Sequence, residues 1–150
     1  MGKTVKTCVL MALAAGVLLA ESGDEQATRE STKLDATWAV TSVLRNNNEL
    51  PADRLIDLQM VFRDGSFTIE QGDKTLTRGT FRVDTAKTPH AIDLTSSERD
   101  GSKMTTLAIY ELADGMLRIC GAQPGEPRPG EFTAMDGSGH TLTTCERAKP

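Results

Sequence analysis

Residues 79–94 read GTFRVDTAKTPHAIDL, and residues 107–132 continue in the same rhythm as LAIYELADGMLRICGAQPGEPRPGEF. In both stretches apolar and polar residues alternate, and short segments rich in Gly, Pro or Asp interrupt the alternation. A period of two places successive side chains on opposite faces of a β-strand. Asp114-Gly115, like Asp64-Gly65 earlier in the chain, is a dipeptide typical of a tight hairpin turn. Each stretch therefore predicts two β-strands joined through a turn.

The same pattern extends in both directions along the chain of 150 residues. One helical turn is expected over 50–56, where Pro51 suits a first helical position. The predicted strands cover 38–44, 58–62, 67–69, 75–83, 91–95, 104–112, 116–120 and 141–147. An antiparallel sheet of about eight strands with short sequential connections loses its edges best by closing into a barrel. The sequence thus predicts an all-β, single-domain, up-and-down β-barrel over residues 34–150.

One face of each predicted strand carries the large apolar residues and is expected to be mostly buried inside the barrel. The residues assigned to this core are Leu58, Met60, Phe62, Phe67, Ile69, Phe81, Val83, Ala108, Tyr110 and Leu112. Such a barrel is either filled by side chains or wide enough for one small ligand.

The first residues have the order of a secretory signal peptide. Lys3 and Lys6 precede an uncharged apolar run from Cys8 to Ala20, and a polar segment follows it. The run is shorter than the ~20 residues that a transmembrane helix needs, so no integral membrane span is expected. Cleavage after Ala20, with Gly23 as a second candidate, would remove residues 1–20 and export the domain to the periplasm or the extracellular space.

Cleavage at that site would leave 15 basic and 21 acidic residues, a formal charge of −6. An acidic surface argues against nucleic acid or an anionic membrane as partner, because both need basic patches. Residues 21–33 contain no apolar side chain larger than Ala. They are therefore expected to form a disordered, solvated linker before the domain.

Several short motifs in consistent order resemble a lipocalin-like family of bacterial proteins that is especially numerous in planctomycetes. The matching residues are Thr37-Trp38, Val61-Phe62, Gly65, Phe67-Thr68, Gly79-Thr80-Phe81, Asp84, Pro89, Ala91 to Leu94, Ile109 to Leu112, Leu117, Cys120, Pro124-Gly125, Arg128-Pro129 and Glu131-Phe132. The match covers roughly residues 34–148. Ala36 departs from it, since the family usually has Gly there. The resemblance implies a secreted lipocalin-like (calycin-type) barrel and no activity, because the family has no agreed biochemical function.

The resemblance also implies how the barrel closes at one end. In lipocalin-like barrels an early Trp packs under a basic residue of the last strand, and Trp38 and Arg147 are similar in position to that pair. A cation over an indole face contributes ~0.5–2 kcal/mol. The alternative is that Arg147 is a solvated strand end.

Removal of the signal peptide leaves two cysteines, Cys120 and Cys145. An oxidising compartment favours a disulfide between them. Neither shares a strand face with the larger apolar residues of its own strand, so both side chains could project from the same side of the sheet. The alternative is two separate buried thiols.

No catalytic motif or metal-ligand cluster stands in the sequence. His90 and Asp93 are three residues apart on a predicted strand and would point to opposite faces, so with His140 they do not make a metal site. Asp93 is either a buried acid with a raised pKa in a pocket or, as we favour, an outer-face carboxylate that accepts hydrogen bonds from backbone N–H groups of the neighbouring loop. We therefore expect neither enzymatic activity nor a cofactor.

Two functions remain, and a monomer is expected for both. In the first, the barrel binds a small apolar or amphipathic molecule. The candidate lining residues are Met60, Phe62, Phe67, Phe81 and Tyr110. In the second, the barrel is filled, and the rigid loop around Pro124–Pro129 contacts or inhibits a protein partner.

Overall fold

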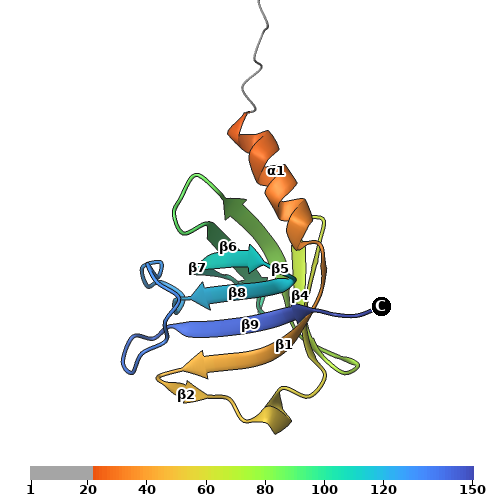
Figure 1. Ribbon diagram of the computed structural model, residues 1–150, viewed down its shortest axis with the longest axis vertical. Helices are drawn as coiled ribbons and strands as arrows, with labels where there is room; N and C mark the ends of the chain where they lie inside the picture. Colours follow the sequence, from red (N-terminus) through yellow and green to blue (C-terminus); the bar gives the residue numbers. More distant parts are fainter. Residues whose placement is uncertain (1–21) are drawn as a thin grey trace, which may run out of the picture.

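The computed structural model describes residues 22–150 (Figure 1), so the predicted signal peptide, residues 1–20, lies outside the described residues. One helix, α1 (Gly23–Leu34), precedes a series of strands. The strands are β1 (Ala36–Arg45), β2 (Asn48–Glu49), β3 (Leu58–Arg63), β4 (Ser66–Gln71), β5 (Lys74–Asp84), β6 (Ala91–Ser97), β7 (Lys103–Ala113), β8 (Met116–Gly121) and β9 (Thr141–Arg147). A 3₁₀ turn, η1 (Ala52–Arg54), lies where the sequence predicts one helical turn.

The strands form a closed antiparallel barrel. From β3 to β9 each strand pairs with the next one in the sequence, and β1 pairs with both β3 and β9. Eight strands thus make a continuous ring, and the two-residue β2 adds to the edge of β1. The predicted fold, an up-and-down barrel of about eight strands, is confirmed.

Two of the hairpins turn at Asp-Gly dipeptides, as the sequence predicts. Asp64 and Gly65 join β3 to β4 with φ angles of 49° and 76°, and Asp114 and Gly115 join β7 to β8 with 53° and 75°. Positive φ at both central residues is the geometry whose twist matches that of the flanking strands. These turns fix the register, so that Phe62 lies opposite Phe67 and Leu112 opposite Leu117.

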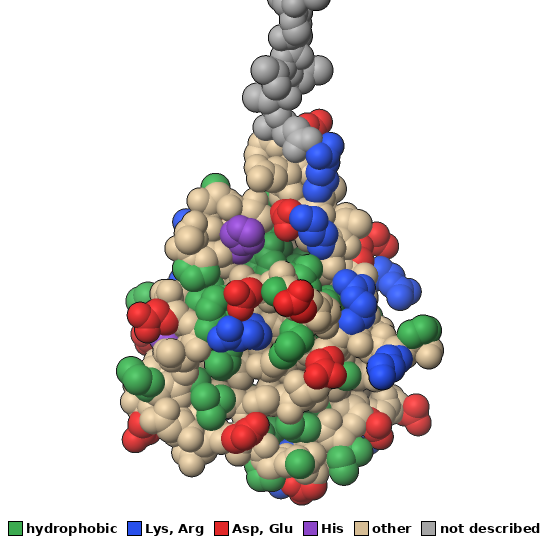
Figure 2. Space-filling model, viewed as in Figure 1, with side chains coloured by type: hydrophobic (Ala, Val, Ile, Leu, Met, Phe, Trp, Pro, Cys, Tyr) green, Lys and Arg blue, Asp and Glu red, His purple; other side chains and the backbone are tan. Residues whose placement is uncertain are grey.

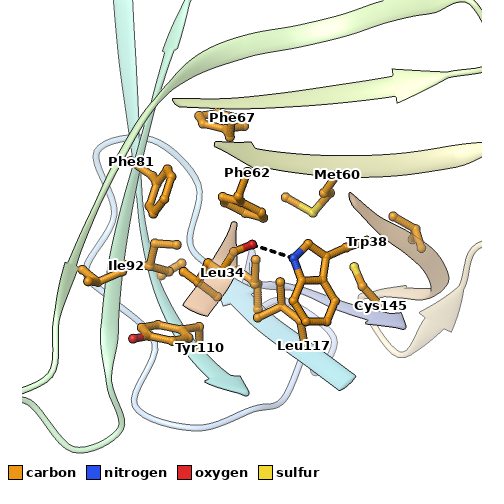
Figure 3. Packing of buried hydrophobic residues seen from close by; sticks show 14 residues of the cluster. Leu34, Trp38, Met60, Phe62, Phe67, Phe81, Ile92, Tyr110, Leu117 and Cys145 are labelled. Atoms are coloured by element: carbon orange, nitrogen blue, oxygen red, sulfur yellow. Dashed lines mark hydrogen bonds between the residues drawn. The ribbon is translucent and has the colours of Figure 1, made fainter. Parts of the chain in front are cut away.

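The core fills the half of the barrel that lies next to α1 (Figure 3). The Phe62 ring meets the Phe81 ring edge-on, with 5.0 Å between centroids, and it lies 6.3 Å from Phe67. Of the ten residues assigned to the core from the sequence, seven are buried, and Leu58, Ile69 and Leu112 are partly buried. The assignment of inward faces was therefore right, although burial differs along the barrel.

The prediction of a disordered linker over 21–33 is wrong, because most of it belongs to α1. The Ser22 hydroxyl accepts a hydrogen bond from the Glu25 backbone N–H at 3.4 Å, and acidic residues occupy the first turn. Carboxylates near a helix N-terminus are favoured by the helix dipole. Leu34, the last residue of α1, is fully buried in the barrel core and ties the helix to it.

The barrel end next to Leu34 is closed by Trp38 and Arg147. The Arg147 guanidinium lies 4.7 Å from the centre of the Trp38 ring, the arrangement that the family resemblance implies for this pair, and Arg147 is therefore not a free strand end. The indole Nε1 donates a hydrogen bond to the Leu34 carbonyl at 2.8 Å (Figure 3). An Arg147 Nη also approaches the Lys33 carbonyl at 3.4 Å. The end of α1 and the end of β9 thus close one end of the barrel together.

Candidate functional site

The barrel end opposite Trp38 contains a hollow of about 350 Å³. Its walls come from the far half of β1 and from the ends of the neighbouring strands, and residues of the β8–β9 connection border it. The lining residues are Val40, Val43, Arg45, Leu58, Met60, Ile69, Leu94, Thr106, Ile119, Gly121, Ala122, Gln123, Pro124, Gly139, Thr141 and Thr143. A volume of this size lies within the range of small-molecule sites.

The wall on β1 is apolar because a β-bulge changes the alternation of that strand. Val40 pairs with Cys145 and Val43 with Thr143, and the register shifts between Val40 and Ser42. The extra residue of a bulge lets two side chains at odd spacing share one face. Val40 and Val43 therefore both line the hollow although they are three residues apart.

Of the five residues predicted from the sequence to line a cavity, only Met60 does so. Phe62, Phe67 and Phe81 pack against one another in the filled half, and Tyr110 is buried in the same core. The aromatic rings thus close off the inner part of the barrel, and aliphatic side chains line the outer part. Period-two alternation tells which face of a strand points inward, but not how far along the barrel axis a residue lies.

The mouth of the hollow carries Arg45 on β1 and Thr141 on β9. These residues are cross-strand partners, and Arg45 Nε donates a hydrogen bond to Thr141 Oγ1 at 3.0 Å. Arg45 is the only charged residue among those that line the hollow, all of which belong to the described part of the chain. The Gln123 side chain packs against Gly139 beside the same mouth.

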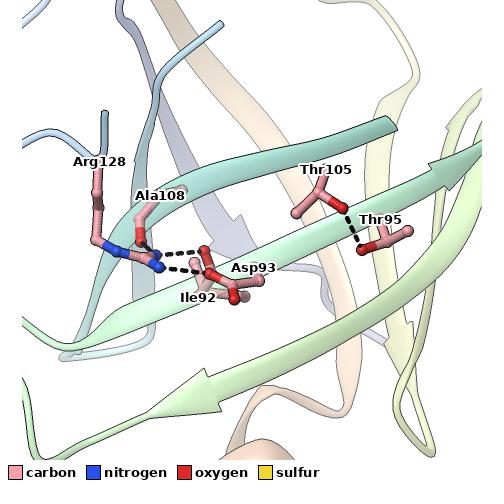
Figure 4. A network of polar contacts seen from close by, with 6 residues as sticks. All are labelled: Ile92, Asp93, Thr95, Thr105, Ala108 and Arg128. Carbon is pink, nitrogen blue, oxygen red and sulfur yellow. Dashed lines mark hydrogen bonds and ion pairs between the residues drawn. The ribbon is translucent and has the colours of Figure 1, made fainter. Parts of the chain in front are cut away.

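The long β8–β9 connection, residues 122–140, is held against the outside of the barrel by Arg128 (Figure 4). Its guanidinium donates hydrogen bonds to the carbonyls of Ala108, at 2.6 Å, and Ile92, at 3.2 Å. It also forms an ion pair with Asp93 at 2.7 Å. Asp93 thus lies on the outer face, as we favoured from the sequence, but its partner is a side chain of the loop rather than backbone N–H groups.

A later part of the same loop is also attached to the barrel. The Arg118 guanidinium lies 4.7 Å from the centre of the Phe132 ring and pairs with Glu111 at 3.0 Å. The Ala134 carbonyl accepts a hydrogen bond from the Asn47 backbone N–H at 2.8 Å. The loop that borders the hollow is therefore fixed at several points along its length.

A second hollow, of about 400 Å³, lies between the start of α1 and the end of β5. It is lined by charged side chains of both signs: Asp24, Arg82, Asp84, Lys87, Asp93 and Arg128. Charged side chains of both signs are also scattered over the face seen in Figure 2. Because opposite charges in one hollow offset each other, this hollow favours no one class of ligand over another.

Tyr110 carries a buried polar group beside the core. Its hydroxyl makes no hydrogen bond to any residue of 22–150, and its ring lies 5.7 Å from that of His90. Burial, together with the nearby Glu30 carboxylate, raises the pKa of Tyr110 to about 12. The neutral phenol is therefore strongly favoured at neutral pH.

The predicted Cys120–Cys145 disulfide is wrong: both cysteines are free and buried. In the pairing of β8 with β9, Cys145 lies opposite Leu117 and Cys120 lies opposite Leu142. The Cys145 side chain packs in the core, whereas the Cys120 Sγ faces outward to the Thr133 carbonyl at 3.3 Å. The two thiols thus lie on opposite faces of the sheet. The prediction failed because β9 turns threonines, and not Leu142, toward the interior.

Within residues 22–150, no group of three or more His, Cys, Asp or Glu side chains is placed to hold a metal ion. In the same part of the chain, no helix has the length and apolar character needed to cross a membrane. Comparisons with protein-family models, curated proteins and solved structures find no significant match to this chain.

Proposed function

We propose that this chain is a non-catalytic binding protein that holds a small apolar or amphipathic molecule in the open half of its barrel. The observation that carries the proposal is the hollow of about 350 Å³ with walls formed mainly by Val, Leu, Ile, Met and Thr side chains. Water in such a space is held by few hydrogen bonds, so an apolar ligand that replaces it gains free energy. The packed aromatic half beneath makes the site a cup rather than a channel.

The proposal includes export and a lipocalin-like family, both of which rest on the sequence. Lys3, Lys6 and the apolar run to Ala20 support export to the periplasm or the extracellular space. The ordered series of motifs supports the family. The mature protein would act as a monomer, because every strand of the closed ring is paired on both sides and the outer edge of β2 is only two residues long.

The alternative, a filled barrel that acts on a protein partner through the loop around Pro124–Pro129, is less well supported. Arg128 of that loop and Phe132 just beyond it are engaged with the barrel wall. Residues 123–127 are exposed but include no aromatic or long aliphatic side chain that a partner could bury, whereas the hollow beside them is open and lined mainly by apolar side chains.

The test is the binding of a neutral apolar fluorophore, together with native mass spectrometry of protein purified from its own host. Leu94→Trp places a large ring in the hollow and should weaken binding at least tenfold. Leu76→Trp is the matched control, because Leu76 is 54% exposed and does not line the hollow. Thermal melting of each variant checks that it folds. Equal binding by both variants, or no binding by the wild type and no co-purifying molecule, would contradict the proposal.

Export has its own measurement. The intact mass of the protein recovered from the host should correspond to a chain that lacks residues 1–20. A folded protein that retains Met1 to Ala20 would exclude export through this segment.

A further inference from the structure

We propose that the ligand is a single-chain amphiphile with one anionic headgroup, whose oxyanion pairs with Arg45 at the mouth and whose apolar chain extends into the hollow. This inference rests on the proposed function and specifies its ligand. Three observations carry it: the charge of the wall, the geometry of Arg45, and the order of side chains from the mouth inward.

The charge of the wall is opposite to that of the whole chain. The chain carries 21 acidic and 17 basic residues, yet among residues 22–150 the only charged side chain that lines the hollow is basic. An uncharged ligand would gain nothing from a charge at the mouth, whereas an anionic headgroup there would accept charge-assisted hydrogen bonds from the guanidinium. A single cation at the mouth is therefore best explained by a ligand with a single anion.

The geometry of Arg45 leaves part of its guanidinium available. Its Nε is used by Thr141 Oγ1, which fixes the side chain on the inward face of the barrel. Arg45 forms no ion pair with any residue in the described range 22–150, and it is exposed. Glu49 on the neighbouring β2 pairs with Leu44, and its carboxylate accepts a hydrogen bond from Ser42 at 3.0 Å. The two terminal nitrogens of Arg45 can thus donate side by side to a carboxylate or a similar oxyanion.

Along β1, polarity falls from the mouth inward. Arg45 comes first, Val43 next and Val40 last. On the neighbouring strand β9, Thr141 and Thr143 lie nearer the mouth than the buried Cys145 does. A headgroup at the mouth and a chain toward the core match this order. At ~30 Å³ for each water-sized group, the hollow holds roughly a dozen such groups. The chain therefore has about 8–12 carbons.

The experiment compares four probes of equal chain length by calorimetry: decanoate, decyl sulfate, decanol and decylammonium. Decanoate or decyl sulfate should bind at least tenfold more tightly than decanol, and decylammonium should bind most weakly. The tighter of the two anions identifies whether the headgroup is planar or tetrahedral. Binding of the anion should weaken as salt is added, because the mouth is exposed to solvent.

Variants assign the effect to Arg45. Arg45→Met should weaken binding of the anion about tenfold and leave that of decanol within twofold, whereas Arg45→Lys should retain the preference for the anion. Arg78→Met is the control, because Arg78 is exposed on β5 and does not line the hollow.

The outcomes separate this inference from the proposed function. If all four probes bind alike, and Arg45→Met changes none of them, the headgroup assignment is overturned and a binding site for apolar molecules stands. The same assignment fails if decylammonium binds most tightly. If no probe binds, and the neutral fluorophore does not bind either, the proposed function fails as well.

Discussion

At the scale of single residues, Gly79 shows how closely the strands pack. It lies in β5 opposite Phe67, and a Cβ added there would lie 2.0 Å from the Thr95 carbonyl oxygen and 2.9 Å from a Phe67 ring carbon. An aromatic ring that covers a glycine on a neighbouring strand is a recognised way of keeping a curved sheet packed. The close approach of the Thr95 carbonyl and the Phe67 ring thus explains why the Gly-Thr-Phe motif begins with a glycine.

Gly79→Ala should therefore destabilise the fold. Because the carbonyl belongs to the backbone, either β5 or β6 must move, and overpacking of this kind typically costs about 1–3 kcal/mol. Chemical denaturation measures the change in the free energy of unfolding. Gly130→Ala is the control, because a Cβ at Gly130 would meet nothing within 4 Å. If the two substitutions had equal effects, the close approach at Gly79 would be in doubt.

Tyr110 predicts how stability depends on alkaline pH. Its pKa is raised from 10.0 to about 12 in the folded protein, first by burial and then by Glu30. Since the folded state holds the proton more tightly, this contribution to stability is complete below pH 10 and is lost as the pH rises from about 10 to 12. The full contribution is about 3 kcal/mol.

Tyr110 is the only tyrosine of the chain, so the ultraviolet absorbance of tyrosinate measures its titration directly. The midpoint should lie near pH 12 in the folded protein and near pH 10 after denaturation. Tyr110→Phe should be as stable as the wild type at neutral pH, because the hydroxyl makes no hydrogen bond within residues 22–150. Above pH 10 the variant should lose less stability than the wild type does. A midpoint near 10 in the folded protein would show that the hydroxyl is solvated.

At the scale of elements, the β8–β9 loop depends on Arg128. Arg128→Met removes its hydrogen bonds to two carbonyls and its ion pair with Asp93. We expect a loss of about 1–3 kcal/mol, because these hydrogen bonds involve a charged donor. Amide hydrogen exchange across residues 122–140 should become faster, while the amides of the barrel strands should keep their protection from exchange. The control is Arg99→Met, because Arg99 is exposed in the β6–β7 turn. It should leave the free energy of unfolding and the amide exchange of residues 122–140 unchanged. Unaltered exchange in the Arg128→Met protein would mean that other contacts suffice to hold the loop.

The elements also show which parts of the structure the sequence could predict. Strands such as β3 and β7 follow from alternation, and the Asp-Gly turns follow from the positive φ that both residues tolerate. The helix α1 was missed because Leu34, at its very end, is its only fully buried residue, so no apolar stripe marks it. Ser22 and Glu25, spaced as in a capping box, were the available signal.

The candidate site was only partly predictable, because alternation shows which face of a strand points inward but not how the interior is packed. The face on which Met60 lies follows from alternation, but the division of the barrel into an aromatic half and an open half depends on three-dimensional packing. The inward position of Arg45 depends on the bulge in β1, which shifts the register between Val40 and Ser42. A strand read with strict alternation from Trp38 places Arg45 on the outside.

At the scale of the whole molecule, the barrel holds together without a covalent cross-link. Eight strands close on themselves, so every barrel strand has a neighbour on both sides, and α1 closes one end. Burial raises the pKa of Cys145 to about 12 and also raises that of Cys120, which keeps both thiols protonated and unreactive at neutral pH. Both cysteines are free, on opposite faces of the sheet.

The melting temperature should therefore be the same with and without a reducing agent. A thiol reagent should react slowly with the folded protein at neutral pH and, after denaturation, should find two thiols in a chain that lacks residues 1–20. A count of three would show that Cys8 and the apolar run are retained. A count of zero without reductant, together with a lower melting temperature once reductant is added, would mean that β8 and β9 pair in a different register. The inward position of Cys145 would then be wrong, and with it that of Thr143, two residues earlier in the wall of the hollow.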